Sequence, residues 1–475
     1  MGFVPFVGLI YIFNLIVGTG ALTLPAAFAR AGWALSTISL VFLAFISYMN
    51  ATYVIETMAC ANAVFKWKKL QTLKRLKNSL NIKKNIFCYR KTEQPLVCGD
   101  SIPSRYYSLD QKVELGQMAN LFFNKTGRTL FYCTLCIYLY GDLSIYSAAV
   151  AKSIMDVICS ELPSNMTDPS EAEHLPCFNS TTTSLHPYSR VEVYRVALLT
   201  FVAAMGPFVF CNVQKTKYLQ LFTSGMRWLA FAIMISMAIH LLAVRGAQGH
   251  PAAVRGAGLP PLFGACVYSF MCHHSLPALV SPIRTKHKLG LHLALDFSII
   301  TVFYLLLAFT GAFAFAHLND LYTLNFIPKD NENIFLEIVE YFLALFPVFT
   351  LSTSFPIIAI TLRNNLQSLF LDTSRLESYN IILRKLLFPI VAVIPPLLLT
   401  YFLEDISILI EFTGSYAGTG IQYLIPTFLV ISARRHCANL LGLGVVNTYK
   451  SPFAHVAWGV FVLLWSFVCL VKFSY

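Results

Sequence analysis

The sequence predicts an all-α polytopic membrane protein with about 11 transmembrane helices. Hydrophobic residues make up 56% of the 475 residues and charged residues only 12%, whereas about 25% of a soluble globular chain is charged. Apolar segments of about 20 residues or more, the length that crosses a bilayer, recur along the whole chain. The net charge of +12 must therefore be interpreted from its placement and not as affinity for nucleic acid.

The apolar segments divide the chain around one sizeable polar insertion. In chain order, the segments of spanning length are 3–28, 33–60, 129–159, 191–211, 218–244, 262–281, 291–316, 334–361, 381–403, 406–431 and 453–473. We therefore expect helices 1 and 2 within 1–63, a basic cytoplasmic loop at 64–128, and helices 3 to 11 within 129–475.

The first apolar segment contains a signal for an internal break. Gly18, Thr19 and Gly20 lie in its middle, where each glycine disfavours helix by roughly 1 kcal/mol. Unwound chain persists in hydrocarbon only where it lines a cavity or a ligand, because every backbone N–H and C=O needs a partner. The pattern predicts a discontinuous helix 1 that offers main-chain groups to a bound molecule. A glycine-rich packing face between two helices is the alternative.

Positive charge marks one side of the membrane. With the N-terminus in the cytoplasm, the loops after helices 2, 4, 6, 8 and 10 carry about 26 of the 35 Lys and Arg residues, as the positive-inside rule requires. The opposite loops, such as 320–332, are neutral or acidic. We therefore expect a cytoplasmic N-terminus, an extracellular or lumenal C-terminus, and a plasma or endolysosomal membrane. No cleaved signal peptide is expected, because the first residues carry no basic stretch.

The loop between helices 3 and 4, at 160–190, has features of an extracytoplasmic segment. It contains two N-glycosylation sequons, at Asn165 and Asn179, on the side already assigned as outside. Cys159 and Cys177 flank the same loop and could pair in an oxidising compartment. The sequons and the charge pattern thus agree on the orientation.

The basic loop at 64–128 has two interpretations. Its first part, 66–84, is rich in Lys and Arg with interspersed Leu, which is typical of a helix lying on anionic lipid. A disordered linker that binds a cytosolic protein fits the composition as well.

One acidic residue lies near the centre of a predicted span. Asp142 occurs in the sequence YLYGDLSIY of helix 3, and ionisable side chains inside a membrane are costly and rare. Burial disfavours the charged form of a carboxyl group, so Asp142 could exchange a proton near neutral pH. The alternative is a structural aspartate bonded to the neighbouring tyrosine hydroxyls. For Glu56 and Glu411 we favour a structural role.

Helices 6 and 8 carry polar groups beside a proline. Pro277 follows His273 and His274, and proline removes a helical hydrogen bond, so a second break is expected near 270–275. Helix 8 contains Ser352, Thr353 and Ser354. Together with free carbonyls of a broken helix 1, these hydroxyls would suit a sodium ion. They could equally bond to the backbone of their own helix.

Four of these features resemble the amino acid/auxin permease superfamily. They are N-x-x-x-G-T-G-A-L-x-x-P at 14–25, Gly141-Asp142-Leu143, F-x-C-H at 270–273, and Ile425-Pro426 at the end of helix 10. Longer stretches, such as YIFNLIVGTGALTLP, QKTKYLQ, YSFMCHHSLP and YAGTGIQYLIP, resemble a single branch of that superfamily. The resemblance extends along essentially the whole chain.

The resemblance implies an inverted-repeat (5+5) transporter fold, in which helices 1 to 5 and 6 to 10 are inverted copies. It implies that Val17, Gly18, Thr19, Gly20 and Ala21 present main-chain groups to a substrate carboxylate. It also implies roles for Tyr268, Ser269 and Phe270 at the substrate amino group and side chain. The residues implied for ion coupling are Asn14 and one hydroxyl among Ser352, Thr353 and Ser354.

We therefore expect a secondary active transporter of amino acids, coupled to protons or sodium around a mid-membrane site. The alternative is an amino acid sensor or scaffold that signals through the loop at 64–128. Expected partners are a small amino acid, the lipid bilayer and a cytosolic protein at the basic loop, with no nucleic acid. We expect no cofactor beyond the coupling ion and no metal site. An enzyme is not expected, because nucleophile elbow, P-loop and metal-ligand motifs are absent from the sequence.

Overall fold

The computed structural model describes residues 13, 16–79, 106–159, 175–177, 188–210, 217–283, 286, 288–327, 334–371, 386–442 and 445–472. Three residues singled out from the sequence, Asn14, Asn165 and Asn179, lie outside these ranges, as does 80–105 of the basic loop. Their predicted roles stay predictions.

The described chain is helical and shows one isolated β-bridge, between Pro176 and Ser189. The helices are α2 (Thr19–Ala31), α3 (Trp33–Ser79), α4 (Leu115–Phe122), α5 (Lys125–Ile158), α7 (Arg190–Met205), α8 (Lys217–Arg245), α9 (Leu259–Ser269), α10 (Leu276–Val280), α11 (Leu289–Ala314), α12 (Ile334–Ala344), α13 (Phe346–Phe370), α14 (Phe388–Phe402), α15 (Ile406–Phe412), α16 (Ile425–Leu441) and α17 (Val456–Lys472). Shorter 3₁₀ turns are η1 (Gly206–Phe210), η2 (Gly256–Gly258) and η3 (Tyr322–Phe326), and two π-helical stretches, η6 (Thr413–Gly418) and η7 (Gly420–Leu424), join α15 to α16.

Six helical stretches in the described ranges are long and apolar enough to cross a membrane, and α14 and α17 are shorter apolar helices. The predicted class, a polytopic all-α membrane protein, is therefore supported. The number of about 11 spans and the inverted-repeat arrangement stay predictions.

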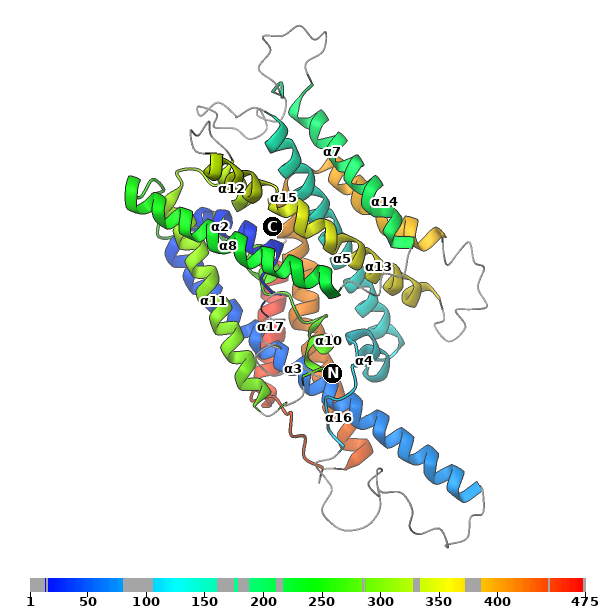
Figure 1. Ribbon diagram of the computed structural model, residues 1–475. Helices are drawn as coiled ribbons and strands as arrows, with labels where there is room; N and C mark the ends of the chain where they lie inside the picture. Colours follow the sequence, from blue (N-terminus) through cyan, green and yellow to red (C-terminus); the bar gives the residue numbers. More distant parts are fainter. Residues whose placement is uncertain are drawn as a thin grey trace.

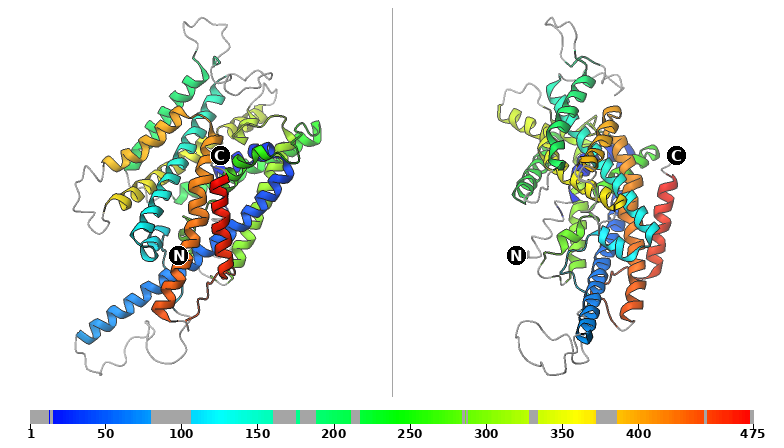
Figure 2. Two further views of the ribbon diagram at one scale, coloured as in Figure 1. Left: turned by 180° about the vertical axis from the view of Figure 1, so that it is seen from behind. Right: turned by 90° about the vertical axis from the view of Figure 1, so that its right-hand side faces the viewer.

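The helices form an elongated bundle (Figures 1 and 2). α5 packs on α13, α7 and α14, while α3 packs on α16 and α11, and α2 packs on α9 and α11. α3 is one continuous helix of 47 residues because it contains neither glycine nor proline. Its C-terminal part projects from one end of the bundle (Figure 1). The start of the basic loop, up to Ser79, is therefore helical.

Two glycines allow α9 to approach η6 very closely. A Cβ atom at Gly414 would lie 2.1 Å from the carbonyl oxygen of Gly264, and one at Gly264 would lie 2.6 Å from Cα of Glu411. Both contacts are made by backbone atoms, which cannot rotate away as a flexible side chain can. Glycine is therefore required at this crossing for steric reasons.

One end of the bundle is held by a buried ion pair between α3 and α16. Glu56, whose exposed fraction is only 2%, accepts hydrogen bonds from Arg434 Nε at 2.8 Å and Nη2 at 2.7 Å. The backbone N–H of Ser451 donates to the same carboxylate at 2.9 Å. With its charge and lone pairs satisfied, Glu56 has the structural role that we favour from the sequence.

The other end is held by Asp320, in the loop after α11. Its carboxylate accepts hydrogen bonds from Arg30 of α2 and, at 2.8 Å, from the Ser407 hydroxyl of α15, and Lys152 of α5 lies 3.7 Å away. Burial by itself would raise the pKa of Asp320, but Lys152 and Arg30, with the hydrogen bonds, outweigh it and hold the pKa below its usual value. One carboxylate thus connects three helices.

A disulfide joins Cys159, at the end of α5, to Cys177, the pair that flanks the predicted extracytoplasmic loop. Nearby, Arg190 at the start of α7 donates a hydrogen bond to Asp156 of α5. The ion pair ties the end of α5 to the start of α7, and the disulfide ties the end of α5 to the segment 175–177.

We expect Gly414→Ala to destabilise the protein, because the added methyl group overlaps the carbonyl of Gly264. Overpacking of this kind costs about 1–3 kcal/mol. The measurement is the thermal unfolding midpoint of the purified protein in detergent. The matched control is Gly225→Ala, since a Cβ there meets nothing within 4 Å. An equal midpoint for both variants would contradict the assigned crossing.

We expect Asp320→Asn to lower the unfolding midpoint at neutral pH by an amount that is insensitive to moderate acid. A folded-state pKa below the unfolded value stabilises the protein above the unfolded pKa, about 3.9, and this contribution is lost as the pH falls through the folded pKa. The difference between wild type and variant should stay constant from about pH 8 to pH 5 and shrink only below about pH 4. A difference that already disappears by pH 5 would show that the carboxylate is not stabilised as described.

Candidate functional site

The first membrane segment is interrupted at Val17 and Gly18. Phe13 and Ile16 are helical, Val17 and Gly18 are bends, and α2 begins at Thr19. Gly18 precedes the helix with φ −123° and ψ −144°, outside the helical region. The break predicted from the glycines is thus present. The first N–H groups of α2, which have no acceptor within their own helix, begin here and carry a partial positive charge.

Two side chains from other helices satisfy carbonyls at this break. The Tyr304 hydroxyl of α11 lies 3.0 Å from the carbonyl oxygen of Ile16. Arg227 Nη1 of α8 donates to the carbonyl oxygen of Val17 at 3.0 Å. The interruption is therefore stabilised by tertiary contacts, as unwound backbone inside a membrane requires.

The two glycines of the break have different roles. A Cβ atom at Gly20 would lie 2.6 Å from both Cα and Oγ of Ser269 at the end of α9, so Gly20 is a packing glycine. At Gly18 the nearest atom would be 4.0 Å away, and the residue is only half-buried. The packing interpretation therefore applies to Gly20, and the interpretation as an accessible break applies to Gly18, which has space beside it.

A second break separates α9 from α10. Phe270 to Ser275 lie between the two helices, where proline and the polar residues predict an interruption. The Tyr304 hydroxyl lies 2.9 Å from the carbonyl oxygen of Ser269 and 3.0 Å from that of Ile16. A hydroxyl carries one proton and can donate to only one of them at a time. Tyr304 thereby links the two breaks.

Asp142 of α5 lies beside these breaks. Its carboxylate has an exposed fraction of 6% and accepts a hydrogen bond from the Tyr268 hydroxyl of α9. Tyr138 and Tyr146 of the same helix are its electrostatic neighbours, and Tyr146 also lies beside Thr19 of α2. The acid predicted from the sequence is therefore connected to both broken segments.

Arg227 is the residue that the sequence reasoning missed. It lies inside the apolar helix α8 and reaches the break at Val17, and its electrostatic neighbours include Tyr146 and Tyr304. Tyr146 is an electrostatic neighbour of both Asp142 and Arg227. The available signal was the arginine itself, because a charge inside a membrane segment marks a functional position by default.

The residues at and around the break differ in how exposed they are. Gly18, Tyr146 and Arg227 are half-buried, whereas Val17 and Asp142 are buried. An arginine exposed to hydrocarbon would be costly, so this side of the break is suited to water or a polar ligand. Arg227 and the half-buried Gly18 lie on this side, and the buried Asp142 is linked to it through Tyr146.

The three hydroxyls predicted for a sodium site bond to the backbone of their own helix. Ser352 donates to the carbonyl of Val348, and Thr353 and Ser354 donate to that of Thr350. All three hydroxyls thus bond within α13, which packs on α5, α14 and α8. Asn14 lies outside the described residues. The sodium site therefore stays a prediction.

Phe270 and His273 are buried at the second break, and His274 is half-buried there. Phe270 stacks on Phe297 and packs edge-on against Tyr304, with ring centroids 6.2 and 5.3 Å apart, which is a packing environment. His273 Nε2 lies 3.0 Å from the carbonyl oxygen of Ser47. The His274 ring lies 5.7 Å from that of Tyr138. These side chains pack around the second break.

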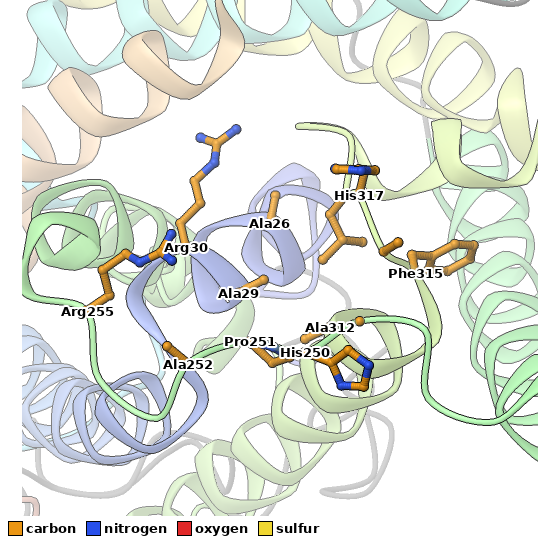
Figure 3. A pocket seen from close by; sticks show the side chains of 13 residues that line it. Ala26, Ala29, Arg30, His250, Pro251, Ala252, Arg255, Ala312, Phe315 and His317 are labelled. Carbon is orange, nitrogen blue, oxygen red and sulfur yellow. The ribbon is translucent and has the colours of Figure 1, made fainter. Parts of the chain in front are cut away.

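A cavity of about 310 Å³ lies at the other end of α2. Figure 3 shows Arg30, Arg255, His250 and His317 around it. Arg30 is about 16 Å along the helix from Thr19, at 1.5 Å per residue. This basic cavity is therefore separate from the break and lies next to the Asp320 contacts.

A helical membrane bundle with two interrupted segments, and with main-chain groups and buried charges at the breaks, is typical of a secondary transporter. The sequence profile of the family described as "Transmembrane amino acid transporter protein" matches residues 5–69 and 103–472. The chain therefore belongs to this family of amino acid transporters, as the superfamily resemblance predicts.

Individual relatives define the branch. The chain is 55% identical over 493 residues to "Transmembrane protein 104 homolog" of Drosophila melanogaster, which covers 98% of this chain and 96% of the relative. It is 45% identical over 482 residues to "Transmembrane protein 104" of Homo sapiens, covering 98% and 95%. For the homologue of Dictyostelium discoideum the identity is 30% over 505 residues, covering 97% and 94%. Within the family, the chain belongs to the transmembrane protein 104 branch.

Proposed function

We propose that the protein is a secondary active transporter that binds a zwitterionic amino acid at the two breaks. The observation that carries the proposal is the placement of Arg227 and Asp142 around the interrupted backbone of helix 1. A zwitterion has one negative and one positive group, and this region offers a partner for each. Membership of the amino acid transporter family supports the same substrate class.

The carboxylate of the substrate would bind at the start of α2. The first-turn N–H groups of α2 favour an anion, and Gly18 leaves this side open. The Arg227 guanidinium, which donates to the Val17 carbonyl, has a planar shape and a charge that suit a carboxylate. This matches the main-chain role that the superfamily resemblance implies for Val17 to Ala21.

The amino group of the substrate would bind near Asp142 and Tyr268. The carboxylate of Asp142 accepts the Tyr268 hydroxyl, and an ionised carboxylate has room for further donors. An ammonium group beside it would be stabilised by its charge. The amino group would then lie at α5 and at the end of α9.

Proton coupling fits the geometry better than sodium coupling. Arg227 already supplies a positive charge at the Val17 carbonyl, a group that would otherwise be a ligand for sodium. The hydroxyls of α13 bond to their own helix, where they do not help to coordinate an ion. Asp142 is a buried acid inside a predicted span, the kind of side chain that relays protons in transporters.

The two breaks would serve as hinges for alternating access. Tyr304 lies within hydrogen-bonding distance of carbonyls at both breaks, so a change at one break alters the partner available at the other. We propose that the predicted inverted repeats repack around this point, with the N-terminus in the cytoplasm and the 160–190 loop glycosylated outside.

The sensor alternative depends on the projecting part of α3. This helix continues beyond the bundle (Figure 1), and its residues Lys68, Lys69, Lys74 and Arg75 are exposed or nearly so. Such a segment could contact a cytosolic protein in response to a ligand. Measuring amino acid flux distinguishes a transporter from a sensor, because a sensor binds the amino acid without carrying it across the membrane.

We expect amino acid uptake into proteoliposomes to be driven by an imposed pH gradient. Asp142→Asn should abolish the gradient-driven part, because an amide cannot take up and release a proton at this site. The control is Asp110→Asn, which changes an aspartate with an exposed fraction of 73% away from the breaks. Proton coupling would be rejected if the uptake rate were the same with and without the pH gradient, or if Asp142→Asn left gradient-driven uptake unchanged. Ligand binding without any flux would favour the sensor.

We expect transport to persist when external sodium is replaced by choline, because Arg227 occupies the Val17 carbonyl. Arg227→Met should raise the half-saturating amino acid concentration about ten- to a hundredfold, since a hydrogen bond to a charged group contributes about 1.5–3 kcal/mol. Arg227→Lys should retain part of the affinity, and Arg245→Met, at the end of the same helix, should leave it unchanged. Loss of transport in choline would establish sodium coupling and contradict this role of Arg227.

A further inference from the structure

A second cavity, of about 480 Å³, lies at the end of the bundle from which α3 projects. It is lined by Thr52 and Ile55 of α3, by residues from Lys286 to Gly290 at the start of α11, and by 448–452 before α17. Its volume is within the range of about 300–1,000 Å³ that is typical of ligand sites. Its lining includes none of the residues at the breaks of helices 1 and 6.

Three lysines face this cavity: Lys286, Lys288 and Lys450. The carboxylate of Asp110 lies 3.5 Å from Lys286 Nζ and is the acidic group paired with these lysines in the described chain. The Glu56 carboxylate, on the neighbouring turn of α3, is already neutralised by Arg434. The cavity therefore has an excess of positive charge.

The walls of the cavity are held in place by hydrogen bonds. Ser451 shares a 2.7 Å hydrogen bond with the hydroxyl of Thr52, and its backbone N–H donates to Glu56. Lys286 Nζ donates to the carbonyl oxygen of Leu109 at 2.7 Å, and its side chain has an exposed fraction of only 8%. The Tyr48 hydroxyl of α3 donates to the carbonyl oxygen of Gly290 at 3.1 Å, so α3, the start of α11 and 448–452 are held together around one space. This is a preformed site and not a chance gathering of surface lysines.

The lining suits a phosphorylated group. Lysine ammonium groups bind phosphate as point charges, and the hydroxyls of Thr448 and Tyr449 add donors at the rim. Leu289 and Gly290, in the first turn of α11, also line the cavity, and a helix N-terminus favours an anion. Ile55, Leu289 and Pro452 supply an apolar wall, which a free phosphate would leave in contact with water.

We propose that this lysine cavity binds the phosphorylated headgroup of an anionic membrane lipid, one that carries phosphate groups beyond the bridging phosphodiester. The cavity begins where the candidate span Leu289–Ala314 begins, which is the depth of lipid headgroups. The loops on this side carry most of the basic residues, as expected for a face on an anionic leaflet.

The test measures binding to the purified full-length protein in neutral detergent, by the change in its tryptophan fluorescence or thermal midpoint. The probes are short-chain phosphatidylinositol 4,5-bisphosphate, short-chain phosphatidylserine, inositol 1,4,5-trisphosphate and inorganic phosphate. We expect the phosphoinositide to bind most tightly. Inositol trisphosphate binding as tightly as the lipid would retain the phosphate site but assign it to a free phosphorylated metabolite.

The variant Lys288→Gln/Lys450→Gln should weaken phosphoinositide binding by roughly 30-fold, because each lysine near an anionic surface contributes about 1 kcal/mol. Lys286→Gln is the second variant, and it also tests the contact with Leu109. The matched control is Lys68→Gln/Lys69→Gln on the projecting part of α3, which removes the same charge elsewhere. Equal weakening by the control pair, or no preference for the phosphoinositide over phosphatidylserine, would overturn the site in favour of diffuse surface attraction.

Discussion

The structure depends on one constraint: the main-chain carbonyls of an interrupted helix must find partners where water is scarce. Tyr304 and Arg227, from two different helices, provide those partners at Ile16 and Val17. Without them the break would leave buried acceptors unsatisfied, at a cost of about 1–3 kcal/mol each. Because Tyr304 also lies next to the Ser269 carbonyl, the same requirement couples the first break to the second.

Close helix packing places the charged groups around this centre. A Cβ at Gly141 would lie 2.2 Å from Oγ1 of Thr413, so α5 approaches η6 at the residue just before Asp142. Gly20 and Ser269 bring α2 to α9 in the same way. These contacts position Asp142 and Tyr268 next to the break, while Gly18 leaves one side open. Gly20 and Gly141 therefore allow close helix packing, whereas Gly18 leaves space beside the break.

The sequence predicts the membrane class, the break in helix 1 and the intramembrane acid, because each depends on local composition. It does not predict how the hydroxyls of Ser352 to Ser354 are used, since a serine in a helix can bond to its own backbone or to a neighbour. Arg227 was detectable as a charge in an apolar segment. Its partner was not, because Val17 is 210 residues away in sequence.

Composition and the Gly-Thr-Gly pattern by themselves determined that this chain is a membrane protein with a weak point in its first helix. Those properties follow from hydrophobicity and helix propensity, which act within a few residues. Only the tertiary structure decided which side chains bond to the interrupted backbone, which of the two glycines has space beside it, and that lysines from two distant segments line one cavity. Such contacts depend on how helices cross in space, and residue order does not encode that locally.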